Sequence, residues 1–352
     1  MKKRALVHGR SNIPAQASSP IGKDFDPRGY RRGLGATNKY TRKFLNDPDA
    51  KRRMEDEGIG YSTTGLVAQI REKNFAHTEE GVTIKLADSY GFCWGVERAV
   101  QMCYEARKQY PTKEIWITNE IIHNPTVNMR LSEMGVNFIQ ETDGVKNFNP
   151  VKSESVVILP AFGASIDEMK LLADIGVMIV DTTCPWVSRV WNSVDRHARK
   201  QFTSIIHGKF EHEETIATAS FAKTYLVVKD IKEARWVCDY ILNRGATKTE
   251  FMRKFKNAHS DGFDPVKDLD AVGVANQTTM LKGETEAIGK LFERTMMEKY
   301  GVQNLGKHYF VTNTICGATQ ERQDAILKLI DEKPDIMIIV GGFNSSNTSH
   351  LQ

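Results

Sequence analysis

The sequence lacks any apolar run near the roughly 20 residues that a transmembrane helix needs, so it predicts no membrane span. It also lacks a G-x-x-x-x-G-K-[ST] loop and a G-x-G-x-x-G turn after a strand. Nucleotide-driven chemistry and a classical dinucleotide site therefore have no support. The five cysteines are an odd number, widely spaced, in a chain with no secretory signal. Buried thiols or metal ligands explain them better than a disulfide scaffold does.

Acidic residues are scarce only at the start of the chain. Residues 1–53 hold 14 Lys or Arg against 4 Asp or Glu, whereas the remainder holds 34 against 40. No acidic residue occurs up to Gly22, and Arg, Lys and Ser are frequent there. This composition favours an organelle targeting remnant or a solvated tail over nucleic-acid binding, so we expect no nucleic-acid partner.

Short β-branched or apolar runs alternate with amphipathic helical patterns from Val82 onward. Such alternation predicts an α/β fold with parallel sheets covered by helices, in which ligands bind beyond the carboxyl ends of the strands. The expected strands are Val82–Leu86, Ile115–Thr118, Val156–Leu159, Val177–Val180, Ser204–His207, Tyr225–Val228, Ala271–Ala275 and Ile336–Val340. The expected helices are Thr64–Lys73, Gly95–Lys108, Ile166–Asp174, Val187–Arg199, Ile231–Leu242, Lys282–Lys299 and Thr319–Asp331.

Three of the five cysteines share one local context, between a strand and a helix. Cys93 lies in the turn before Gly95, Cys184 follows an expected strand, and Cys316 lies just before an expected helix. We therefore expect each thiol at the amino end of a helix. Unpaired N–H groups and the helix dipole favour the metal-binding thiolate at such a position.

Three thiolates brought together could hold a cubane iron–sulfur cluster by three irons and leave the fourth iron open to substrate. Because such clusters normally use four protein thiolates, a missing fourth ligand points to catalysis more than to electron transfer. The alternative is that each thiol is a buried small hydrophobic residue, as a lone cysteine usually is. Cys103 and Cys238 fall inside amphipathic patterns, and we interpret both as core residues.

Histidine, hydroxyl and amide side chains recur at other expected strand ends. His123 and His212 lie at two of these ends, and His212 is followed by two glutamates. A histidine near a carboxylate can deliver protons or bind zinc, although the spacing here is not H-E-x-x-H. The segments 277–279 and 345–347 offer short donors suited to phosphate oxygens. Taken singly, each is most often a helix cap or a turn.

Seven ordered motifs resemble those of the 4-hydroxy-3-methylbut-2-enyl diphosphate reductase family, whose enzyme is the last of the non-mevalonate isoprenoid pathway. The resemblance runs from about residue 80 to the end of the chain. The sequence around Tyr40–Asp56 is also similar to that of the plant and cyanobacterial branch. The motifs are Gly91–Val96, Asn119–Pro125, Asp181–Pro185, His212–Thr215, Gln277–Thr279, the segment around Cys316, and Asn344–Asn347.

The resemblance implies three similar small parallel-sheet α/β units around a central cluster, with the third unit incomplete. We expect a basic N-terminal extension at residues 1–78 and units at residues 79–184, 185–315 and 316–352. The chain stops soon after the run Ile336–Val340, which leaves too few strands for a third sheet of normal width. We therefore expect either a truncated C-terminus or an unusually small last unit.

The resemblance also implies roles for single residues. Phe162 stands where the bacterial branch has a histidine, so that one diphosphate contact is absent, as in the plant-like branch. Family members contribute a further serine to this pocket from beyond Gln352. The implied ligands of a [4Fe–4S] cluster are Cys93, Cys184 and Cys316, and the implied proton-delivery pair is Glu214 and Thr278. The implied substrate and diphosphate contacts are His123, His212, Thr278, Thr279, Ser345, Ser346 and Asn347.

The activity implied is a two-electron, two-proton reductive dehydroxylation of a small allylic diphosphate, which gives isopentenyl and dimethylallyl diphosphate. A reduced ferredoxin or flavodoxin would supply the electrons, since the sequence shows no nicotinamide site. We expect the chain in the plastid stroma or in the cytoplasm of a cyanobacterium-like cell, with a homodimer as one option. The alternatives are a zinc-dependent hydrolase using His212, Glu214 and a thiolate, and an inactive truncated family member.

Overall fold

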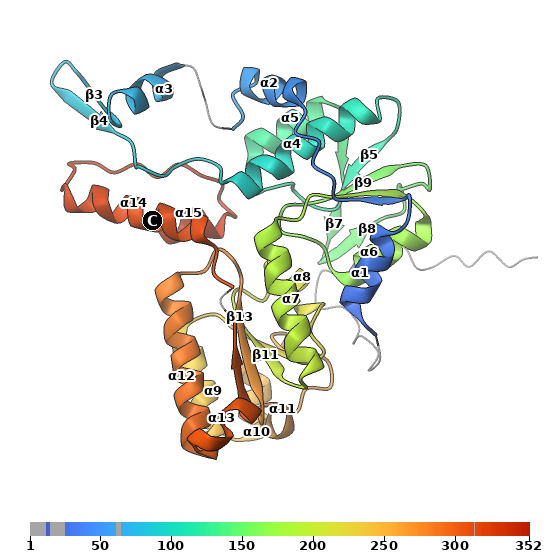
Figure 1. Ribbon diagram of the computed structural model, residues 1–352, viewed down its shortest axis with the longest axis vertical. Helices are drawn as coiled ribbons and strands as arrows, with labels where there is room; N and C mark the ends of the chain where they lie inside the picture. Colours follow the sequence, from blue (N-terminus) through green and yellow to red (C-terminus); the bar gives the residue numbers. More distant parts are fainter. Residues whose placement is uncertain (1–11, 15–24, 61–64, 313) are drawn as a thin grey trace, which may run out of the picture.

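The computed structural model describes residues 12–14, 25–60, 65–312 and 314–352. Two parallel sheets with covering helices form the body of the molecule, one above the other along the long axis of Figure 1, and a third, mostly helical region lies beside both. The expected α/β fold is confirmed. Thr64, the first residue of one expected helix, lies outside the described residues. Within the described part of the chain, no helix is both long and apolar enough to span a bilayer.

The first sheet consists of parallel strands that are buried on both faces. Their order is β2 (Tyr40–Thr41), β10 (Met178–Asp181), β9 (Val156–Leu159), β5 (Ile115–Ile117) and β6 (Val136–Phe138). Val156 and Ile158 pack with α4 (Trp94–Gln109) and α5 (Pro125–Glu133), whereas Val157 and Leu159 pack with α6 (Ile166–Ile175) and α7 (Pro185–Arg199). Successive side chains of a strand point to opposite faces, so one β-branched run serves two cores.

The second sheet is also parallel and shares one helix with the first. Its order is β12 (Tyr225–Val228), β11 (Thr203–His207), β13 (Val272–Asn276) and β14 (Tyr309–Val311). Helix α7 packs on β11 and β13, while α9 (Ile231–Ile241) and α12 (Lys282–Tyr300) pack together on the opposite side (Figure 1). The remaining elements of this part are α8 (Glu213–Ala219), α10 (Lys248–Lys254), α11 (Pro265–Asp268), a 3₁₀ turn (Val302–Asn304) and α13 (Leu305–His308).

Sequence patterns predicted the long buried strands well and the short ones poorly. The expected strands between Ile115 and Ala275 form within one or two residues of their expected bounds. Strands β2, β6 and β14 were missed because two or three residues carry too little periodicity to stand out. A small antiparallel sheet was also missed; its order is β1 (Asn12–Pro14), β8 (Val145–Asn147) and β7 (Glu141–Thr142).

The region after Cys316 corrects one expectation. Residues 336–340 form no strand, and Ile336, Ile338 and Val340 are 79%, 80% and 91% exposed. The expectation of a strand at Ile336–Val340 is wrong in this structure, because no neighbouring strand pairs with these residues to cover their apolar side chains. This region instead consists of α14 (Gly317–Asp331) and α15 (Ser346–Leu351), joined by an extended run.

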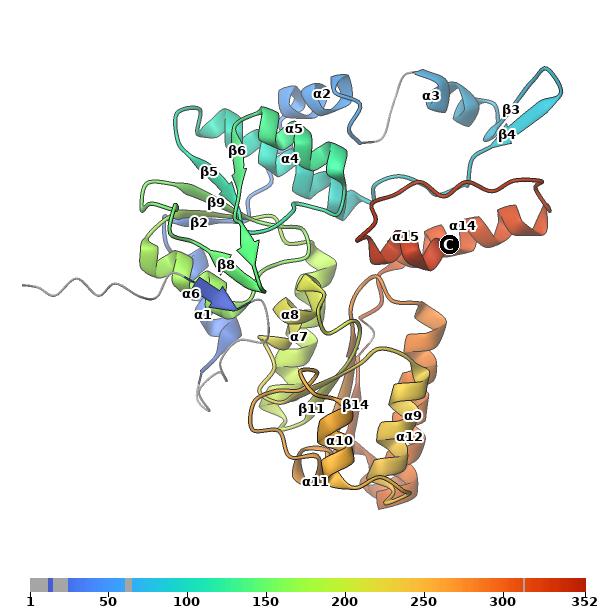
Figure 2. The same ribbon diagram turned by 180° about the vertical axis from the view of Figure 1, so that it is seen from behind.

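The hairpin of β3 (Ala76–Glu79) and β4 (Val82–Lys85) lies beside α14 together with α3 (Gly65–Glu72), as Figures 1 and 2 both show. The expected strand Val82–Leu86 therefore forms, but its partner is antiparallel and its side chains are exposed. Asp88 forms an ion pair with Lys328 of α14 at 2.9 Å, and Lys85 forms one with Glu332, just beyond that helix. Charged contacts, more than apolar burial, hold the hairpin in place.

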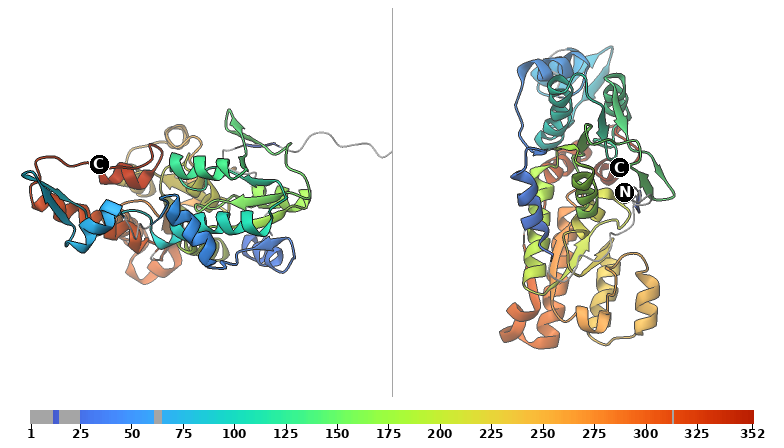
Figure 3. Two further views of the ribbon diagram at one scale, coloured as in Figure 1. Left: turned by 90° about the horizontal axis from the view of Figure 1, so that it is seen from above. Right: turned by 90° about the vertical axis from the view of Figure 1, so that its right-hand side faces the viewer.

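The described part of the basic N-terminal segment is built into the first sheet. Helix α1 (Pro27–Gly35) packs on α7, β2 forms the sheet edge, and α2 (Pro48–Asp56) packs on α4. Leu34, Tyr40 and Met54 are buried. The expectation of a solvated tail is thus wrong for residues 25–53. In the right-hand view of Figure 3 this segment, in blue, runs down one side of the molecule from α4 to α7.

Candidate active site

The three singled-out cysteines each occupy the position immediately before a helix. Cys93 is the N-cap of α4, Cys184 is the N-cap of α7, and Cys316 is the N-cap of α14. The expected placement at helix amino ends is confirmed. Cys184 follows β10 and Cys316 follows β14, so two thiols also lie beyond the carboxyl ends of parallel strands, where α/β folds place their ligands.

The same three thiols converge on one another. A Cβ atom added to Gly95, in the first turn of α4, would lie 2.5 Å from Cys184 Sγ and 3.9 Å from Cys93 Sγ. Cys316 also lies close enough to Cys184 for its charge, like that of Cys93, to add to the effect of burial in raising the pKa of Cys184. Gly95 therefore has a steric reason to lack a side chain: it allows the amino ends of α4 and α7 to approach.

The protonation of these thiols differs from the simple helix-dipole expectation. Burial raises the pKa of Cys184 to about 12, and the N–H groups of Trp186 and Val187 lower it less than burial raises it. Burial likewise raises the pKa of Cys316. Without a metal, Cys184 and Cys316 are neutral at pH 7, so metal binding must displace their protons. Three soft sulfur donors facing one another fit iron–sulfur chemistry better than a hard cation.

The other two cysteines are far from this chemistry. Cys103 is fully buried inside α4 and donates to Ala99 O at 3.4 Å, and Cys238 is buried inside α9. Burial raises the pKa of both thiols. The interpretation of both as core residues is confirmed.

A buried carboxylate and a hydroxyl form a pair between α8 and the end of β13. The Thr278 N–H donates to Glu214 Oε1 at 2.5 Å, and Thr278 Oγ1 donates to Glu214 Oε2 at 2.9 Å. Burial raises the pKa of Glu214 to about 7, although both hydrogen bonds act in the opposite direction. A carboxyl group with this pKa can both give and take a proton near neutral pH. Thr319 Oγ1, three residues after Cys316, donates to Thr278 O at 3.1 Å and ties this pair to α14.

Two histidines from different sheets face each other beside this pair. The ring centroids of His123 and His212 are 5.4 Å apart, and their donor atoms lie with a Glu213 oxygen within 4.8 Å of one another. His123 Nδ1 contacts Glu120 at 2.8 Å, whereas His123 Nε2 is buried without a hydrogen-bond partner and lies 3.7 Å from Glu213. Glu120 and Glu213 stand inside two of the sequence motifs but were not counted as site residues; Glu120 is three residues from His123, whereas only folding brings Glu213 of α8 to it.

The tautomer of His212 disfavours a zinc site here. His212 Nδ1 accepts the N–H of Glu214 at 3.1 Å, and burial lowers the pKa of the ring to about 4. The ring is therefore neutral at pH 7 with its proton on Nε2, which makes that nitrogen a donor and not a metal ligand. Glu214 is engaged by Thr278 and is not part of the histidine group. Two of the three ligands of the zinc-hydrolase alternative, His212 and Glu214, are therefore not available to bind zinc.

Phe162 lies against these histidines. Its ring stacks on His123 at 5.1 Å between centroids and meets His212 edge-on at 6.3 Å. The side chain is buried, so it excludes water from the histidine pair and donates nothing to a ligand.

The hydroxyl and amide groups expected at the substrate pocket meet around Gln277. Gln277 Nε2 donates to Thr279 Oγ1 at 2.8 Å and to Ser346 Oγ at 3.3 Å. Ser345 caps α15, and Asn347 Oδ1 is buried without a hydrogen-bond partner. The structure therefore gathers residues of the segments 277–279 and 345–347 in one place. Gln277 is the link that sequence analysis named in a motif but did not count as a site residue.

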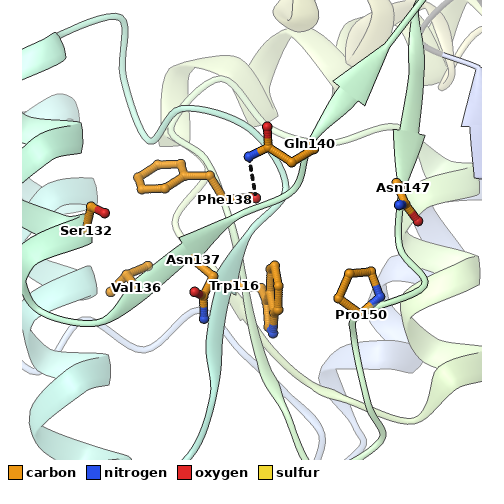
Figure 4. Close-up of a pocket in the computed structure, with 8 residues that line it drawn as sticks. All are labelled: Trp116, Ser132, Val136, Asn137, Phe138, Gln140, Asn147 and Pro150. Atoms are coloured by element: carbon orange, nitrogen blue, oxygen red, sulfur yellow. Dashed lines mark hydrogen bonds between the residues drawn. The ribbon is translucent and has the colours of Figure 1, made fainter.

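The cavity shown in Figure 4 lies elsewhere. It measures about 380 Å³ and is lined by residues of β5, α5, β6, β8 and the neighbouring loops, including Trp116 and Asn147. None of the cysteines or histidines of the candidate site lines it. This cavity is therefore separate from the candidate site.

Comparison with known proteins agrees with this geometry. Residues 84–352 match the family model described as LytB protein. The chain is 60% identical to the 4-hydroxy-3-methylbut-2-enyl diphosphate reductase of Crocosphaera subtropica, over 93% of this chain and 80% of that protein. It is 57% identical to the chloroplastic 4-hydroxy-3-methylbut-2-enyl diphosphate reductase of Botryococcus braunii, over 97% of this chain and 69% of that protein.

A solved structure shares the fold. The E-1-hydroxy-2-methyl-but-2-enyl-4-diphosphate reductase of Plasmodium falciparum superposes with a TM-score of 0.56 at 24% identity, covering 75% of this chain and 70% of that one. At this identity the likeness speaks for the fold alone. With a family model that matches most of its length and relatives at well above half identity, the chain belongs to the LytB protein family.

Proposed function

We propose that this chain reduces (E)-4-hydroxy-3-methylbut-2-enyl diphosphate to isopentenyl diphosphate and dimethylallyl diphosphate. The observation that carries the proposal is the convergence of Cys93, Cys184 and Cys316 at three helix amino ends, beside a buried Glu214 whose pKa is near 7. Three thiols that can hold an iron–sulfur cluster, as an electron source, and a proton donor fit a reductive dehydroxylation. The names of the relatives supply the substrate.

The three cysteines would hold a [4Fe–4S] cluster, each by one iron. When bound, such a cluster supplies electrons and a Lewis-acidic iron that lacks a protein ligand. Cys93, Cys184 and Cys316 contribute the thiolates, and Gly95 keeps the space between two of them free of side-chain atoms. The reaction consumes two electrons and two protons, breaks one C–O bond and releases one water.

Glu214 would deliver the proton that turns the leaving hydroxyl into water. Burial keeps a large fraction of this carboxyl group protonated near pH 7, which an exposed glutamate would not be. Thr278 Oγ1, 2.9 Å from Glu214 Oε2, holds the carboxyl group in place and offers a hydroxyl to the substrate side. The second proton goes to carbon, at either end of the allyl system, which yields the two products.

The diphosphate would be bound by donors that carry little net charge. His212 offers the proton on Nε2, and His123 Nε2 is a buried nitrogen without a partner. Hydroxyl and amide groups complete the set, and a buried, water-poor pocket strengthens each such hydrogen bond. The proposed contacts are His123, His212, Thr278, Thr279, Ser345, Ser346 and Asn347.

The wider setting follows the relatives. We propose a reduced ferredoxin or flavodoxin as electron donor, since the sequence shows no nicotinamide site. The named relatives are cyanobacterial and chloroplastic, so the plastid stroma is the proposed location. The expected division into an extension at 1–78 and units at 79–184, 185–315 and 316–352 remains our proposal for how the chain is organised.

Anaerobic purification followed by metal analysis and a substrate assay tests the proposal. We expect iron and acid-labile sulfide in the chain, and oxidation of a reduced viologen dye only when the diphosphate substrate is present. Zinc without sulfide would support the hydrolase instead. A full cluster without substrate-dependent dye oxidation would show an inactive family member.

A further inference from the structure

The turn that carries Cys184 begins with a buried carboxylate. Asp181 ends β10 with its side chain fully buried, and its Oδ1 accepts the N–H of Thr183 at 2.9 Å. The N–H of Cys184 itself donates to Ala161 O at 2.8 Å. Hydrogen bonds within the first sheet therefore fix the backbone of Asp181–Cys184, and the Asp181 carboxylate accepts one of them.

Both cationic partners of that carboxylate come from the N-terminal segment. Arg31 Nη2 lies 2.9 Å from Asp181 Oδ2, and Arg42 Nε lies 3.2 Å from the same oxygen. The Tyr40 hydroxyl also donates to Asp181 Oδ2. We call Arg31, Tyr40, Arg42 and Asp181 the carboxylate clamp.

Arg42 also holds the backbone next to the cysteine. Its Nη2 donates to Thr183 O at 3.1 Å and to Ser188 Oγ, in the first turn of α7, at 2.9 Å. Arg98 continues this contact, because it donates to Thr182 O at 3.3 Å and to Arg42 O at 3.1 Å. The carbonyl groups of the two residues before Cys184 are thus each bound by an arginine.

The clamp is integrated into the fold and is not a chance surface contact. Strand β2 pairs in parallel with β10, with Tyr40 opposite Ile179, two residues before Asp181. The guanidinium of Arg31 also lies over the Trp191 ring of α7 at 4.6 Å. A planar, always charged group suits this buried pairing, which lysine could not reproduce in geometry.

The charges of the clamp depend on one another. Burial alone would raise the pKa of Asp181, but Arg31 and Arg42, with the Thr183 N–H and the Tyr40 hydroxyl, outweigh burial and hold this pKa below its ordinary value. The carboxylate is therefore ionised at neutral pH. Removal of either arginine leaves a buried charge without full compensation, and the turn must move to reach water.

We propose that Arg31 and Arg42 are positioning residues for Cys184: the N-terminal segment fixes the Asp181–Cys184 turn and thereby the place of one thiol opposite Cys93 and Cys316. The segment then acts on the cluster ligands from outside the site, through hydrogen bonds to the backbone beside one of them. The predicted effect on cluster binding rests on the proposed function. The position of the thiol does not, because it can be measured in the metal-free chain.

The direct test is the alkylation of individual cysteines in the metal-free chain by iodoacetamide, followed by mass spectrometry. In Arg31→Gln/Arg42→Gln we expect Cys184 to react several-fold faster than in the wild type, with Cys316 unchanged, because the turn before Cys184 loses its contacts from both arginines. In the same variant, a chelator should remove iron from the reconstituted chain about tenfold faster. Arg32→Gln and Lys43→Gln are matched controls, because both side chains are exposed neighbours outside the clamp.

Two further variants keep the test decisive if the double variant folds poorly. Adding Asp181→Asn to it removes the unbalanced buried charge and should restore the melting temperature, yet leave Cys184 fast-reacting because Thr183 O and Ser188 stay unbound. Arg42→Lys keeps the charge but loses the planar guanidinium with its several N–H donors, and should give an intermediate alkylation rate of Cys184. Wild-type alkylation of Cys184 in all these variants overturns the proposal. If instead the wild type binds no iron while Cys184 still responds, positioning stands and the proposed cluster function fails.

Discussion

Two of the helices that begin with a cysteine are held in very different ways. Helix α7, after Cys184, lies between both sheets, and the turn before it is bound by three arginines and a tyrosine. Helix α14, after Cys316, lies beside the sheets, and Leu327 and Ile330 on it are exposed. Cys184 is thus held by contacts from the first sheet and the N-terminal segment. Cys316 is held chiefly through its neighbours Thr314 and Thr319, which form hydrogen bonds with the end of β13 and the loop after it.

This difference indicates which of the two helices a bound cluster would stabilise more. A group that binds only the folded arrangement stabilises it by mass action, and most where the protein itself contributes least. Cluster binding should therefore order α14 more than α7.

The largest effect should follow loss of a thiol. Cys184→Ser and Cys316→Ser should each abolish the visible thiolate-to-iron absorbance of the reconstituted chain, because three ligands leave no spare sulfur for the cluster. Cys238→Ala, in the core of α9, should keep that absorbance. A full cluster in either serine variant would refute the ligand assignment.

Glu214→Gln should lower kcat by roughly 10²- to 10⁴-fold with little change in cluster absorbance, because it removes the proposed proton donor and leaves the thiols in place. The wild-type rate should fall as the pH rises through about 7, the pKa of Glu214. Steady-state dye oxidation from pH 6 to 9 measures both. A glutamine variant with an unchanged rate and pH profile would remove Glu214 from the reaction.

The same group should shape stability. Its folded-state pKa of about 7 lies above the ordinary value of 4.5, so the folded state binds more protons between these values and stability falls as the pH rises through that window. The loss should reach about 3 kcal/mol in the metal-free chain at pH 8, since one pKa unit corresponds to about 1.4 kcal/mol. Glu214→Gln should remove that part of the pH dependence in urea unfolding. An unchanged slope in the variant would place the titration elsewhere.

Much of this arrangement could be predicted from the sequence, for reasons that particular elements show. The run Val156–Leu159 is apolar throughout and β-branched at its first three positions, which predicts a strand buried on both faces. Cys184 follows such a strand and precedes a proline that starts a helix, which fixes its position by local rules.

The rest depends on contacts that local rules do not contain. Tyr40–Thr41 is a strand only because β10, far along the chain, pairs with it. Glu213, the first residue of α8, lies 3.7 Å from His123 of the loop after β5, so this closeness follows from the packing of the two sheets. Ile336–Val340 has a strand's composition but no partner strand, and pattern alone cannot supply one.

Thr319→Val should have a smaller and local effect. It removes the hydrogen bond to Thr278 O, which contributes about 1 kcal/mol to stability. If α14 is the weakly held helix, alkylation of Cys316 in the metal-free chain should accelerate while that of Cys184 stays constant. Equal acceleration at both cysteines would show that the three thiols move as one unit and would break the contrast.

The smallest effect is expected on the exposed run after α14. Ile338→Lys should change the free energy of unfolding by less than about 0.5 kcal/mol, because this side chain is exposed and packs on no sheet. Denaturant unfolding followed by circular dichroism measures it. A loss of several kcal/mol would mean that the run is covered in the folded molecule.

The central claim is that three distant thiols meet to hold one iron–sulfur cluster. The most direct measurement is the iron and acid-labile sulfide content of the anaerobically purified chain, with Cys184→Ser as the comparison. The account predicts about four irons and about four sulfides per wild-type chain and almost none in the variant. Zinc in place of iron, or equal iron in both proteins, would contradict it.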